Sequence, residues 1–334
     1  MSGERCLLTG GTGFVGGHLA ERLAAEGYEL RCLARSRSDR SLLAALGLEV
    51  VIGGLEDRAA LERAAAGCSY VVHCAALVSD WATVAEIRQV NVEGTRNVVD
   101  AALAAGVARF VQISTTDIYG YPGAAGIDES YVPARFANWY AQSKLEAEEE
   151  VRGAAIEAVI LRPATVYGPR STDVVGEIAK AIRGGYMLLV DHGRANAGLC
   201  YIENLEDAVL LALTHPAAPG EAFNVCDGLE VTWQTFTADL ARGLGKRRPR
   251  LSLPFGVARG IGHGLEQSYR VLRRATGVRT PPLLSRQAVD VLGASQAFSN
   301  RKLRERLGWE PRVDYESALA ATIAWLGETR ATAE

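Results

Sequence analysis

The chain alternates short apolar runs with longer segments of helical period through its first half. The apolar runs stand at residues 5–8, 29–34, 49–52, 70–74, 109–114 and 158–161. Between them, residues 58–66, 84–105 and 136–155 repeat apolar positions every three or four residues, which is the period of an amphipathic helix. Strands joined by helices of this length form parallel units with right-handed crossovers. The pattern predicts an α/β fold, a doubly wound Rossmann sheet with ligands beyond the carboxyl ends of its strands.

The regular alternation weakens after Pro169. Helical patterns at 174–182, 205–213, 235–244, 257–276 and 317–326 accompany a short strand pattern at 222–225. We predict a nucleotide-binding Rossmann domain over residues 1–170 and a smaller mixed substrate-binding lobe over residues 171–334. Insertions after late strands would build this lobe, and some of its segments would return to the Rossmann core.

Composition narrows the class of protein. The chain has 334 residues, 48% of them hydrophobic, and a net charge of −3, so it can bury a large core and shows no nucleic-acid surface. The basic run 246–250 is interpreted as a solvated loop, with a phosphate or membrane-surface contact as the alternative. The cysteines and histidines lack ligand spacing, so we expect no metal site and reduced core cysteines. Without a signal-peptide pattern or an apolar run of about 18 residues, we expect a cytoplasmic protein with no integral membrane segment.

Three glycines stand between the first strand and the first helical segment. Gly10 permits a tight turn, Gly13 lets the backbone approach a pyrophosphate, and Gly16 lets the helix pack closely on the strand. The unpaired N–H groups and partial positive charge at the start of the helix suit a phosphate. The spacing predicts a dinucleotide site, and a glycine-rich turn without a ligand is the alternative.

The end of the second strand bears on the choice of cofactor. In the usual dinucleotide fold an acidic residue ends this strand and binds the ribose 2′-hydroxyl. Here the strand runs into Arg35-Ser36-Arg37, with no acid. Arg35, with Arg37 as a second candidate, would face a 2′-phosphate, and Ser36 would add a hydroxyl donor. We therefore favour NADP(H); NAD(H) stays open, because Arg35 can instead stack on adenine.

Candidate chemistry stands at a strand end and on a helix. Tyr140 and Lys144 are four residues apart, so their side chains share one helical face. A free tyrosine has a pKa near 10, and an adjacent ammonium favours the phenolate and lowers that pKa toward the working range. Hydroxyl groups of Ser114 and Thr115, at the end of the fifth strand, can hold a substrate oxygen beside the phenol. The pattern predicts general acid/base catalysis.

These motifs together resemble the extended short-chain dehydrogenase/reductase family, within the NAD-dependent epimerase/dehydratase superfamily. The resemblance covers essentially the whole chain. The motifs that carry it are Thr9-Gly10-Gly11-Thr12-Gly13-Phe14-Val15-Gly16, Asn91-Val92-Glu93-Gly94-Thr95, Ser114-Thr115 before Ile118-Tyr119-Gly120, the Tyr140/Lys144 pair, and Leu161-Arg162-Pro163 before Val166-Tyr167-Gly168-Pro169.

The resemblance implies roles for these residues. Tyr140 would be the general acid/base, Lys144 would bind the nicotinamide ribose and tune Tyr140, and Thr115 would be the catalytic hydroxyl. Asn91 would orient the long helix and its strand. The cofactor would be bound by Gly10, Thr12, Gly13, Phe14, Val15, Gly16, Arg35, Ser36, Leu55, Ala75, Ala76, Asn91, Ser114, Tyr140, Lys144, Pro163, Thr165 and Val166.

One position departs from the family pattern. Many relatives have an acid after the third strand that contacts adenine, and here Gly54 occupies that place. The resemblance then implies that Leu55 and the backbone hold the adenine.

Three branches of the family compete. Sugar-nucleotide epimerases usually carry an acid at the end of the second strand, where this chain has Arg35. Sugar-nucleotide 4,6-dehydratases follow the Ser-Thr pair with Asp-Glu, where this chain has Thr116 and Asp117. The stretches 75–81, 284–286, 298–299 and 307–311 resemble the third branch, the 3β-hydroxysteroid dehydrogenases and related ketone reductases.

We therefore predict an NADP(H)-dependent oxidoreductase that interconverts a hydrophobic ketone and a secondary alcohol. The substrate would be steroid-like, flavonoid-like or a 3-oxoacyl compound, and a sugar-nucleotide epimerase, dehydratase or reductase is the alternative. A non-catalytic cofactor sensor on the same fold is a further alternative. The resemblance implies a homodimer through the helices around 84–105 and 136–155.

Three apolar segments of the second half are open to more than one interpretation. Residues 186–190 and 251–255 would line a lipophilic pocket or form ordinary core. The helical pattern 257–276 would cover the site, contact a membrane surface or simply pack.

Overall fold

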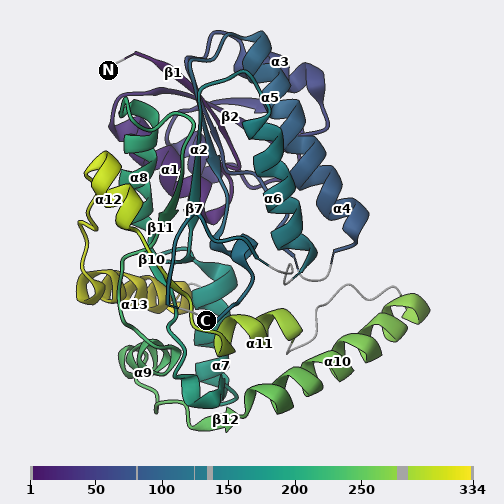
Figure 1. Cartoon of the computed structure of the whole chain (residues 1–334), viewed down its shortest axis with the longest axis vertical. Helices are drawn as coiled ribbons and strands as arrows, with labels where there is room; N and C mark the ends of the chain where they lie inside the picture. Colours follow the sequence, from purple (N-terminus) through teal and green to yellow (C-terminus); the bar gives the residue numbers. More distant parts are fainter. Residues whose placement is uncertain (1–2, 80–81, 124, 134–137, 277–284, 332–334) are drawn as a thin grey trace.

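The computed structural model describes residues 3–79, 82–123, 125–133, 138–276 and 285–331 (Figure 1). Its centre is a parallel sheet of seven strands in the order β11-β7-β5-β4-β1-β2-β3. The chain moves outward from β1 through β2 and β3, then crosses to β4 on the other side of β1. This reversal creates a switch point between β1 and β4, where ligands bind in doubly wound sheets. The strands are β1 (Arg5–Thr9), β2 (Glu29–Ala34), β3 (Glu49–Ile52), β4 (Tyr70–His73), β5 (Arg109–Ile113), β7 (Ala158–Pro163) and β11 (Ala222–Val225).

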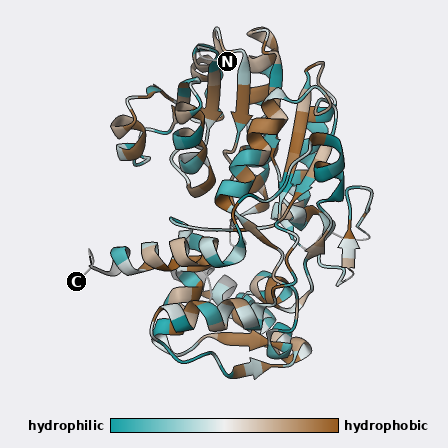
Figure 2. Cartoon of the chain, turned by 90° about the vertical axis from the view of Figure 1, so that its left-hand side faces the viewer, coloured by the Kyte–Doolittle hydropathy of each residue, from teal (hydrophilic) through white to brown (hydrophobic). Residues whose placement is uncertain are grey.

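Helices cover both faces of the sheet. On one face lie α1 (Phe14–Ala25) and α8 (Ile202–Thr214), and on the other α3 (Arg58–Ala65), α5 (Gly94–Ala104) and α6 (Trp139–Arg152). In β1, Cys6 and Leu8 join the core under α1 and α8, whereas Leu7 joins the core under α3 and α5. The strands are therefore apolar on both sides, which explains their continuous apolar runs. Figure 2 shows the same distribution, with hydrophobic strands between helices whose outer faces are more polar.

The predicted α/β doubly wound fold is confirmed. The predicted helix over 84–105 is interrupted in its middle. It consists of α4 (Val84–Arg88), a π-helical turn η1 (Gln89–Glu93) and α5. The predicted helix over 136–155 begins at Trp139 within the described residues, and its first two positions lie outside them.

The second half contributes to two regions. Three of its elements belong to the Rossmann part: α8 covers the sheet, β11 pairs with β7 in parallel, and α12 (Arg301–Leu307) packs against β11. The others build a lobe beyond the carboxyl ends of the strands (Figure 1). These are β8 (Thr165–Tyr167), η3 (Thr172–Gly176), α7 (Glu177–Gly184), β9 (Leu188–Val190), η4 (Asp191–Gly193), β10 (Leu199–Tyr201), α9 (Trp233–Gly243), β12 (Leu251–Leu253), α10 (Phe255–Thr276), α11 (Arg286–Gly293), β13 (Ala297–Phe298) and α13 (Tyr315–Ala331). The remaining elements are α2 (Ser41–Ala45), η2 (Thr116–Tyr119) and β6 (Ala125–Ile127).

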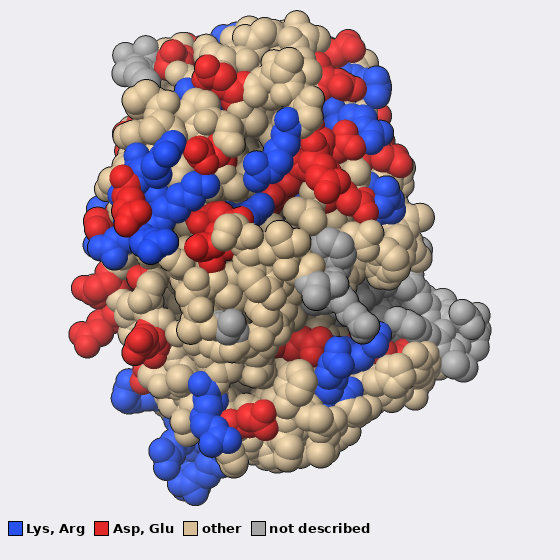
Figure 3. All heavy atoms as spheres, in the orientation of Figure 1, with Lys and Arg blue, Asp and Glu red and all other residues tan. Residues whose placement is uncertain are grey.

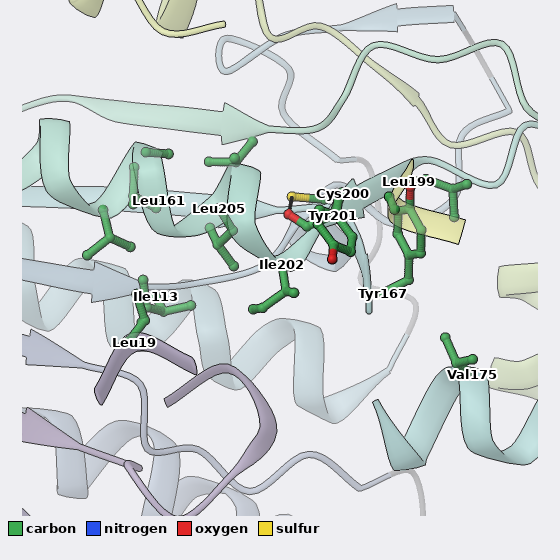
Figure 4. Close-up of a cluster of buried hydrophobic side chains, with 14 of the residues drawn as sticks. Leu19, Ile113, Leu161, Tyr167, Val175, Leu199, Cys200, Tyr201, Ile202 and Leu205 are labelled. Atoms are coloured by element: carbon green, nitrogen blue, oxygen red, sulfur yellow. Dashed lines mark hydrogen bonds between the residues drawn. The ribbon is translucent and has the colours of Figure 1, made fainter. Parts of the chain in front are cut away.

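One hydrophobic core continues from the sheet into the lobe. Figure 4 shows Leu19 of α1 and Leu161 of β7 in the same cluster as Tyr167 and Tyr201 of the small β8–β10 sheet. The rings of Tyr167 and Tyr201 lie 5.4 Å apart, and Phe236 of α9 extends the cluster at 5.6 Å from Tyr167. Because side chains from both regions interdigitate, we expect the lobe to be held firmly on the sheet.

The two apolar segments of the lobe pair with each other. β9 and β12 form a two-stranded parallel sheet in which Leu251 is opposite Leu188. Val190 is buried against Ala258 and Val289, with Phe255 packed beside them. One side of these segments is therefore core, whereas Tyr186 and Leu251 at their starts are 50% and 58% exposed. Among the described helices, none combines the length and the apolarity that crossing a bilayer requires.

Candidate active site

The glycine turn between β1 and α1 has three different constraints. Gly10 has φ +78°, and a Cβ placed there would lie 2.7 Å from the backbone nitrogen of Ala75. A Cβ on Gly16 would lie 2.1 Å from the carbonyl oxygen of Gly10, so only glycine lets α1 approach the turn this closely. A Cβ on Gly13 would meet only the Gly10 oxygen, at 3.4 Å. Gly13 therefore faces open space, as a backbone that approaches a ligand must.

The start of α1 suits an anionic group. Gly13 is the N-cap and has no side chain to accept from the first N–H groups, and the first turn contains no acid. Thr12 and Gly13 are exposed, whereas Phe14 and Val15 are partly buried. Uncapped N–H groups and the helix dipole favour a phosphate at this point. The residues present therefore fit a dinucleotide pyrophosphate.

The end of β2 is basic. Arg35 and Ser36 follow Ala34 directly and are exposed. Among the described residues, no carboxylate lies within 4 Å of the Arg35 guanidinium. A free guanidinium at this sheet edge can accept a phosphate, although it leaves adenine stacking open as well.

The predicted adenine contact lies against α5. The Leu55 side chain is 8% exposed, and a Cβ on Gly94 would lie 2.8 Å from its Cδ1. Asn97 Nδ2 donates to the Leu55 carbonyl oxygen at 2.9 Å. The packing leaves little of the Leu55 side chain open to a ligand.

A buried hydrogen-bonded chain fixes the turn that follows β4. Thr9 Oγ1 lies 2.6 Å from His73 Nδ1, and His73 Nε2 lies 3.1 Å from Thr95 Oγ1. The same Thr9 oxygen accepts from the Ala75 nitrogen at 3.2 Å. Burial, with a smaller effect from Lys144, lowers the pKa of His73 to about 3, so its imidazole is neutral at physiological pH. Ala75 and Ala76 are partly exposed and border the switch point.

Asn91 connects the loop after β4 to the helix α6. Its Oδ1 accepts from the Leu77 nitrogen at 2.7 Å, and its Nδ2 donates to Ser143 Oγ at 2.9 Å. Ser143 Oγ in turn donates to the Tyr140 carbonyl oxygen at 2.7 Å. Asn91 lies in the π-helical turn, which rotates it away from the regular helical register. These contacts hold the loop after β4 against α6.

Tyr140 and Lys144 lie on the buried face of α6. Asn138 caps this helix by accepting from the Ala141 nitrogen at 2.7 Å. Tyr140 is 8% exposed and Lys144 is 3% exposed. Lys144 Nζ donates to the Ile113 carbonyl oxygen, at the end of β5, at 2.7 Å. Burial lowers the pKa of Lys144 to about 8, although its ammonium still gains from neighbouring negative charge.

The electrostatics of Tyr140 correct one prediction. We expected Lys144 to lower the pKa of Tyr140, but burial first, and the carboxylate of Asp117 second, raise it above its ordinary value. The lysine ammonium is directed at the β5 carbonyl oxygen instead. The phenol is therefore protonated at neutral pH and is a weaker acid than a free tyrosine.

The two hydroxyls at the end of β5 have different surroundings. Ser114 is buried, and its Oγ donates to Glu148 Oε1 at 2.6 Å. Glu148 also forms a buried ion pair with Arg162, with Nε–Oε1 at 3.0 Å and Nη2–Oε2 at 2.6 Å. Thr115 is partly exposed, and its Oγ1 accepts from the Asp117 nitrogen at 3.1 Å, which leaves its own proton available. Thr115 is thus the hydroxyl better placed for a substrate.

The stretch after β7 completes the predicted set. Pro163 ends β7 and is buried, while Thr165 and Val166 belong to β8 and are partly exposed. Thr165 Oγ1 donates to Gln296 Oε1 at 3.3 Å. This contact ties the predicted nicotinamide side of the site to the late part of the chain.

Asp117, considered from the sequence only as the residue in place of the dehydratase Glu, lies beside the catalytic candidates. Its carboxyl lies beside the Tyr121 hydroxyl and close enough to Tyr140 to act on its pKa. Burial raises the pKa of Asp117 to about 6. Its position three residues after Ser114 was the only sequence feature that could have placed it in the site. Its pKa depends on burial, which the sequence does not reveal.

The sequence is similar to those of known proteins over most of its length. Residues 6–226 match the NAD dependent epimerase/dehydratase family. The chain is 33% identical to the 4-hydroxy-2-methyl-3-oxo-4-farnesyl-3,4-dihydroquinoline-1-oxide ketoreductase of Stigmatella aurantiaca, over 95% of both chains. It is 30% identical to the 3-beta-hydroxysteroid dehydrogenase of Mycolicibacterium neoaurum, over 96% of this chain and 91% of the relative.

A solved structure shows the same fold. DesIV, the dTDP-glucose 4,6-dehydratase of Streptomyces venezuelae, with NAD and TYD bound, superposes with a TM-score of 0.79 at 24% identity, over 98% of both chains. These similarities agree with the family that the glycine turn and the Tyr140–Lys144 pair indicate. The chain belongs to the NAD-dependent epimerase/dehydratase family and is an NAD(P)-dependent enzyme of the extended short-chain dehydrogenase/reductase type.

Proposed function

We propose that this protein is an NADP(H)-dependent oxidoreductase that interconverts a hydrophobic ketone and a secondary alcohol. The observation that carries the proposal is the pair of Tyr140 and Lys144, both buried on α6 at the carboxyl end of β5. A phenol and an ammonium at the end of β5, the strand next to β4 and its switch point, lie where we expect a dinucleotide and its substrate to meet.

The residues divide the work as follows. When bound, the nicotinamide supplies or takes the hydride. Tyr140 donates its phenolic proton to the carbonyl oxygen as negative charge develops there, and Thr115 donates a second hydrogen bond to the same oxygen. The Lys144 ammonium places a positive charge at the end of β5, next to the site. The phenol is protonated at neutral pH, so it carries the proton that ketone reduction consumes.

Arg35 supports NADP(H) as the preferred cofactor. It is exposed at the end of β2, where NAD-binding relatives usually have an acid, and Ser36 stands beside it. Replacing Arg35 by Ser should raise the KM for NADPH and leave the KM for NADH nearly unchanged. The ratio of the two KM values is the measurement, and an unchanged ratio would assign Arg35 no part in the selection.

The names of the relatives support a hydrophobic substrate. One is a ketoreductase of a farnesylated dihydroquinoline oxide and the other is a hydroxysteroid dehydrogenase. Both compounds carry the reacting oxygen on a large apolar framework. We therefore propose ketones of this class, steroid-like or flavonoid-like ketones and 3-oxoacyl compounds, as the substrates to test.

The test is NADPH consumption with a panel of such ketones. Tyr140→Phe should bind NADPH normally and lose turnover, because the proton donor is gone and the ring is kept. Tyr186→Phe is the matched control, since Tyr186 is 50% exposed in the lobe. Turnover by Tyr140→Phe equal to that of the control would reject Tyr140 as the acid.

A sugar-nucleotide enzyme is the second candidate. Asp117, beside Tyr140 with its pKa raised to about 6, could supply the additional acid or base that such chemistry uses. Tight co-purification of NAD(H), or thermal stabilisation by a dTDP- or UDP-sugar, would favour this candidate.

We also propose a homodimer through α4, α5 and α6. These helices pack side by side, and Leu103 and Trp139 on them are 40% and 54% exposed. Light scattering of the purified protein measures the mass directly, and a monomer at micromolar concentration would reject the proposal.

A further inference from the structure

The helix α10 presents two different faces. Its inner face packs on α11, where Ala258 is buried and a Cβ on Gly262 would lie 3.3 Å from the Arg286 backbone. Glu266 accepts from Arg286 Nε at 2.8 Å on the same side. Figure 1 shows α10 extending from the lobe, away from the Rossmann sheet, with α11 alongside its first part. Among the described side chains of α10, Val257 and Ile261 on the other face are 50% and 45% exposed.

Apolar side chains follow that other face. Val257, Ile261 and Leu272 are 50%, 45% and 44% exposed. At about 100° per residue, these three positions fall within about 60° of each other around the helix axis. They therefore form one line that extends about 22 Å along α10. Exposed aliphatic side chains in a line, rather than scattered singly, indicate an interaction surface.

Two further exposed apolar side chains lie at the strand pair that precedes α10 in the chain. Leu251 of β12 is 58% exposed, and Tyr186, just before β9, is 50% exposed. β12 leads directly into α10, and it pairs with β9. We define the apolar contact surface as these two residues together with Val257, Ile261 and Leu272 of α10.

A basic run stands immediately before this surface in the chain. Lys246, Arg247, Arg248 and Arg250 are exposed, and no carboxylate of the described residues lies within 4 Å of their charged groups. Figure 3 shows Lys and Arg gathered at the lower end of the molecule, beside a surface over α10 that is mostly uncharged. The whole chain has a net charge of −3, so this concentration of positive charge is local.

We propose that α10 and the basic run 246–250 dock the protein on an anionic lipid surface. An exposed apolar line beside unpaired cations is the pattern of helices that lie in the bilayer interface, with apolar side chains among the acyl chains and cations at the headgroups. A nucleic acid would use the cations and leave the aliphatic line unexplained. This surface lies outside the catalytic residues and goes beyond the proposed reaction.

The experiment is co-sedimentation of the full chain with vesicles. We expect binding to phosphatidylcholine mixed with phosphatidylserine, little binding to phosphatidylcholine alone, and weakening as salt is added. The charge variant K246Q/R247Q/R248Q/R250Q should lose affinity by on the order of 600-fold, because each of the four basic residues near an anionic surface contributes about 5-fold. The control R63Q/R301Q removes two exposed arginines elsewhere and should bind like the unmodified protein.

A second variant tests the apolar contribution. V257S/I261S/L272S keeps the cations and should bind weakly and dissociate fully at high salt, where the unmodified protein is partly retained. Circular dichroism and the thermal shift caused by NADPH establish that each variant is folded, so the result does not depend on turnover. No sedimentation of the folded protein with anionic vesicles would overturn the proposal. The proposal would also be overturned if the apolar variant bound anionic vesicles as tightly as the unmodified protein and both bound equally to heparin, a polyanion without acyl chains. Binding would then depend on charge attraction alone.

Discussion

Two substitutions in the glycine turn separate packing from cofactor binding. In Gly16→Ala the new methyl would lie 2.1 Å from the Gly10 carbonyl oxygen and 2.5 Å from its carbonyl carbon. Both are backbone atoms, so α1 must move away by about 1 Å, which is a case of overpacking. In Gly13→Ala the nearest atom is 3.4 Å away, and φ −95° suits alanine. The first change strains the fold, and the second fills the space that a pyrophosphate would use.

We expect the first substitution to change mainly the free energy of unfolding and the second mainly the Kd for NADPH. Gly16→Ala should lower the free energy of unfolding by about 3 kcal/mol, the upper part of the overpacking range, because backbone cannot rotate away. For a chain of this length that is a Tm lower by about 4 °C. Gly13→Ala should lower it by no more than about 1 kcal/mol, the cost of a poorer N-cap. It should raise the Kd for NADPH about 5- to 150-fold, because the methyl costs about 1–3 kcal/mol against the cofactor.

Thermal unfolding with and without NADPH, together with a fluorescence titration, measures both quantities. Gly260→Ala in α10 is the control, since no atom lies within 4 Å of the position that its methyl would take and alanine is a better helix former. A folded Gly13→Ala with the Kd of the unmodified protein would refute the inference that the dinucleotide approaches there. An unchanged Tm in Gly16→Ala would refute the packing argument.

Three further predictions follow from buried groups. Ketone reduction uses the charged form of Lys144, whose pKa is lowered to about 8, so kcat/KM should be full below that pH and fall above it. The arginine in Lys144→Arg stays charged over this range, so kcat/KM of this slower variant should show no such fall as the pH rises. A fall at the same pH would mean that another group causes it. Glu148→Gln leaves Arg162 buried without its carboxylate and should cost about 3–5 kcal/mol in urea unfolding, whereas a loss near zero would contradict the role of the pair. His73 takes up a proton near pH 6.5 when unfolded but only at about 3 when folded, so stability should fall as the pH drops below 6.5, by up to about 1.4 kcal/mol per unit. In His73→Asn the slope of unfolding free energy against pH should be smaller over that window, and an equal slope would exclude the histidine as its source.

The sequence predicted correctly those features that depend on residues close together in the chain. The period of a helix places Tyr140 and Lys144 on one face, and the burial of both confirms that this is the inner face of α6. The steric demands of a tight turn require Gly10, which has φ +78°. The alternation of strands and helices determined the doubly wound sheet, because parallel strands need a crossover and crossovers have one hand.

The pairing of distant segments required the tertiary structure. Residues 188–190 and 251–253 are apolar in the sequence, but only the fold shows that they pair with each other. The long helical pattern of residues 84–105 gave no sign of the π-helical turn that directs Asn91 toward Ser143. Nothing local fixes these arrangements, because each depends on a partner that lies far away in the chain.

The charge states of the site were also decided by the tertiary structure. The sequence places Lys144 one turn from Tyr140 and so predicted a lowered pKa. The fold buries the phenol, directs the ammonium at the Ile113 oxygen and brings Asp117 close, and the pKa rises instead. Likewise the hydroxyl of Ser114 is engaged by Glu148 rather than left for a ligand. The sequence determined which chemical groups the site contains, because helix period and turn geometry are local. Their protonation and partners depend on burial and on distant charges, which exist only once the chain has folded.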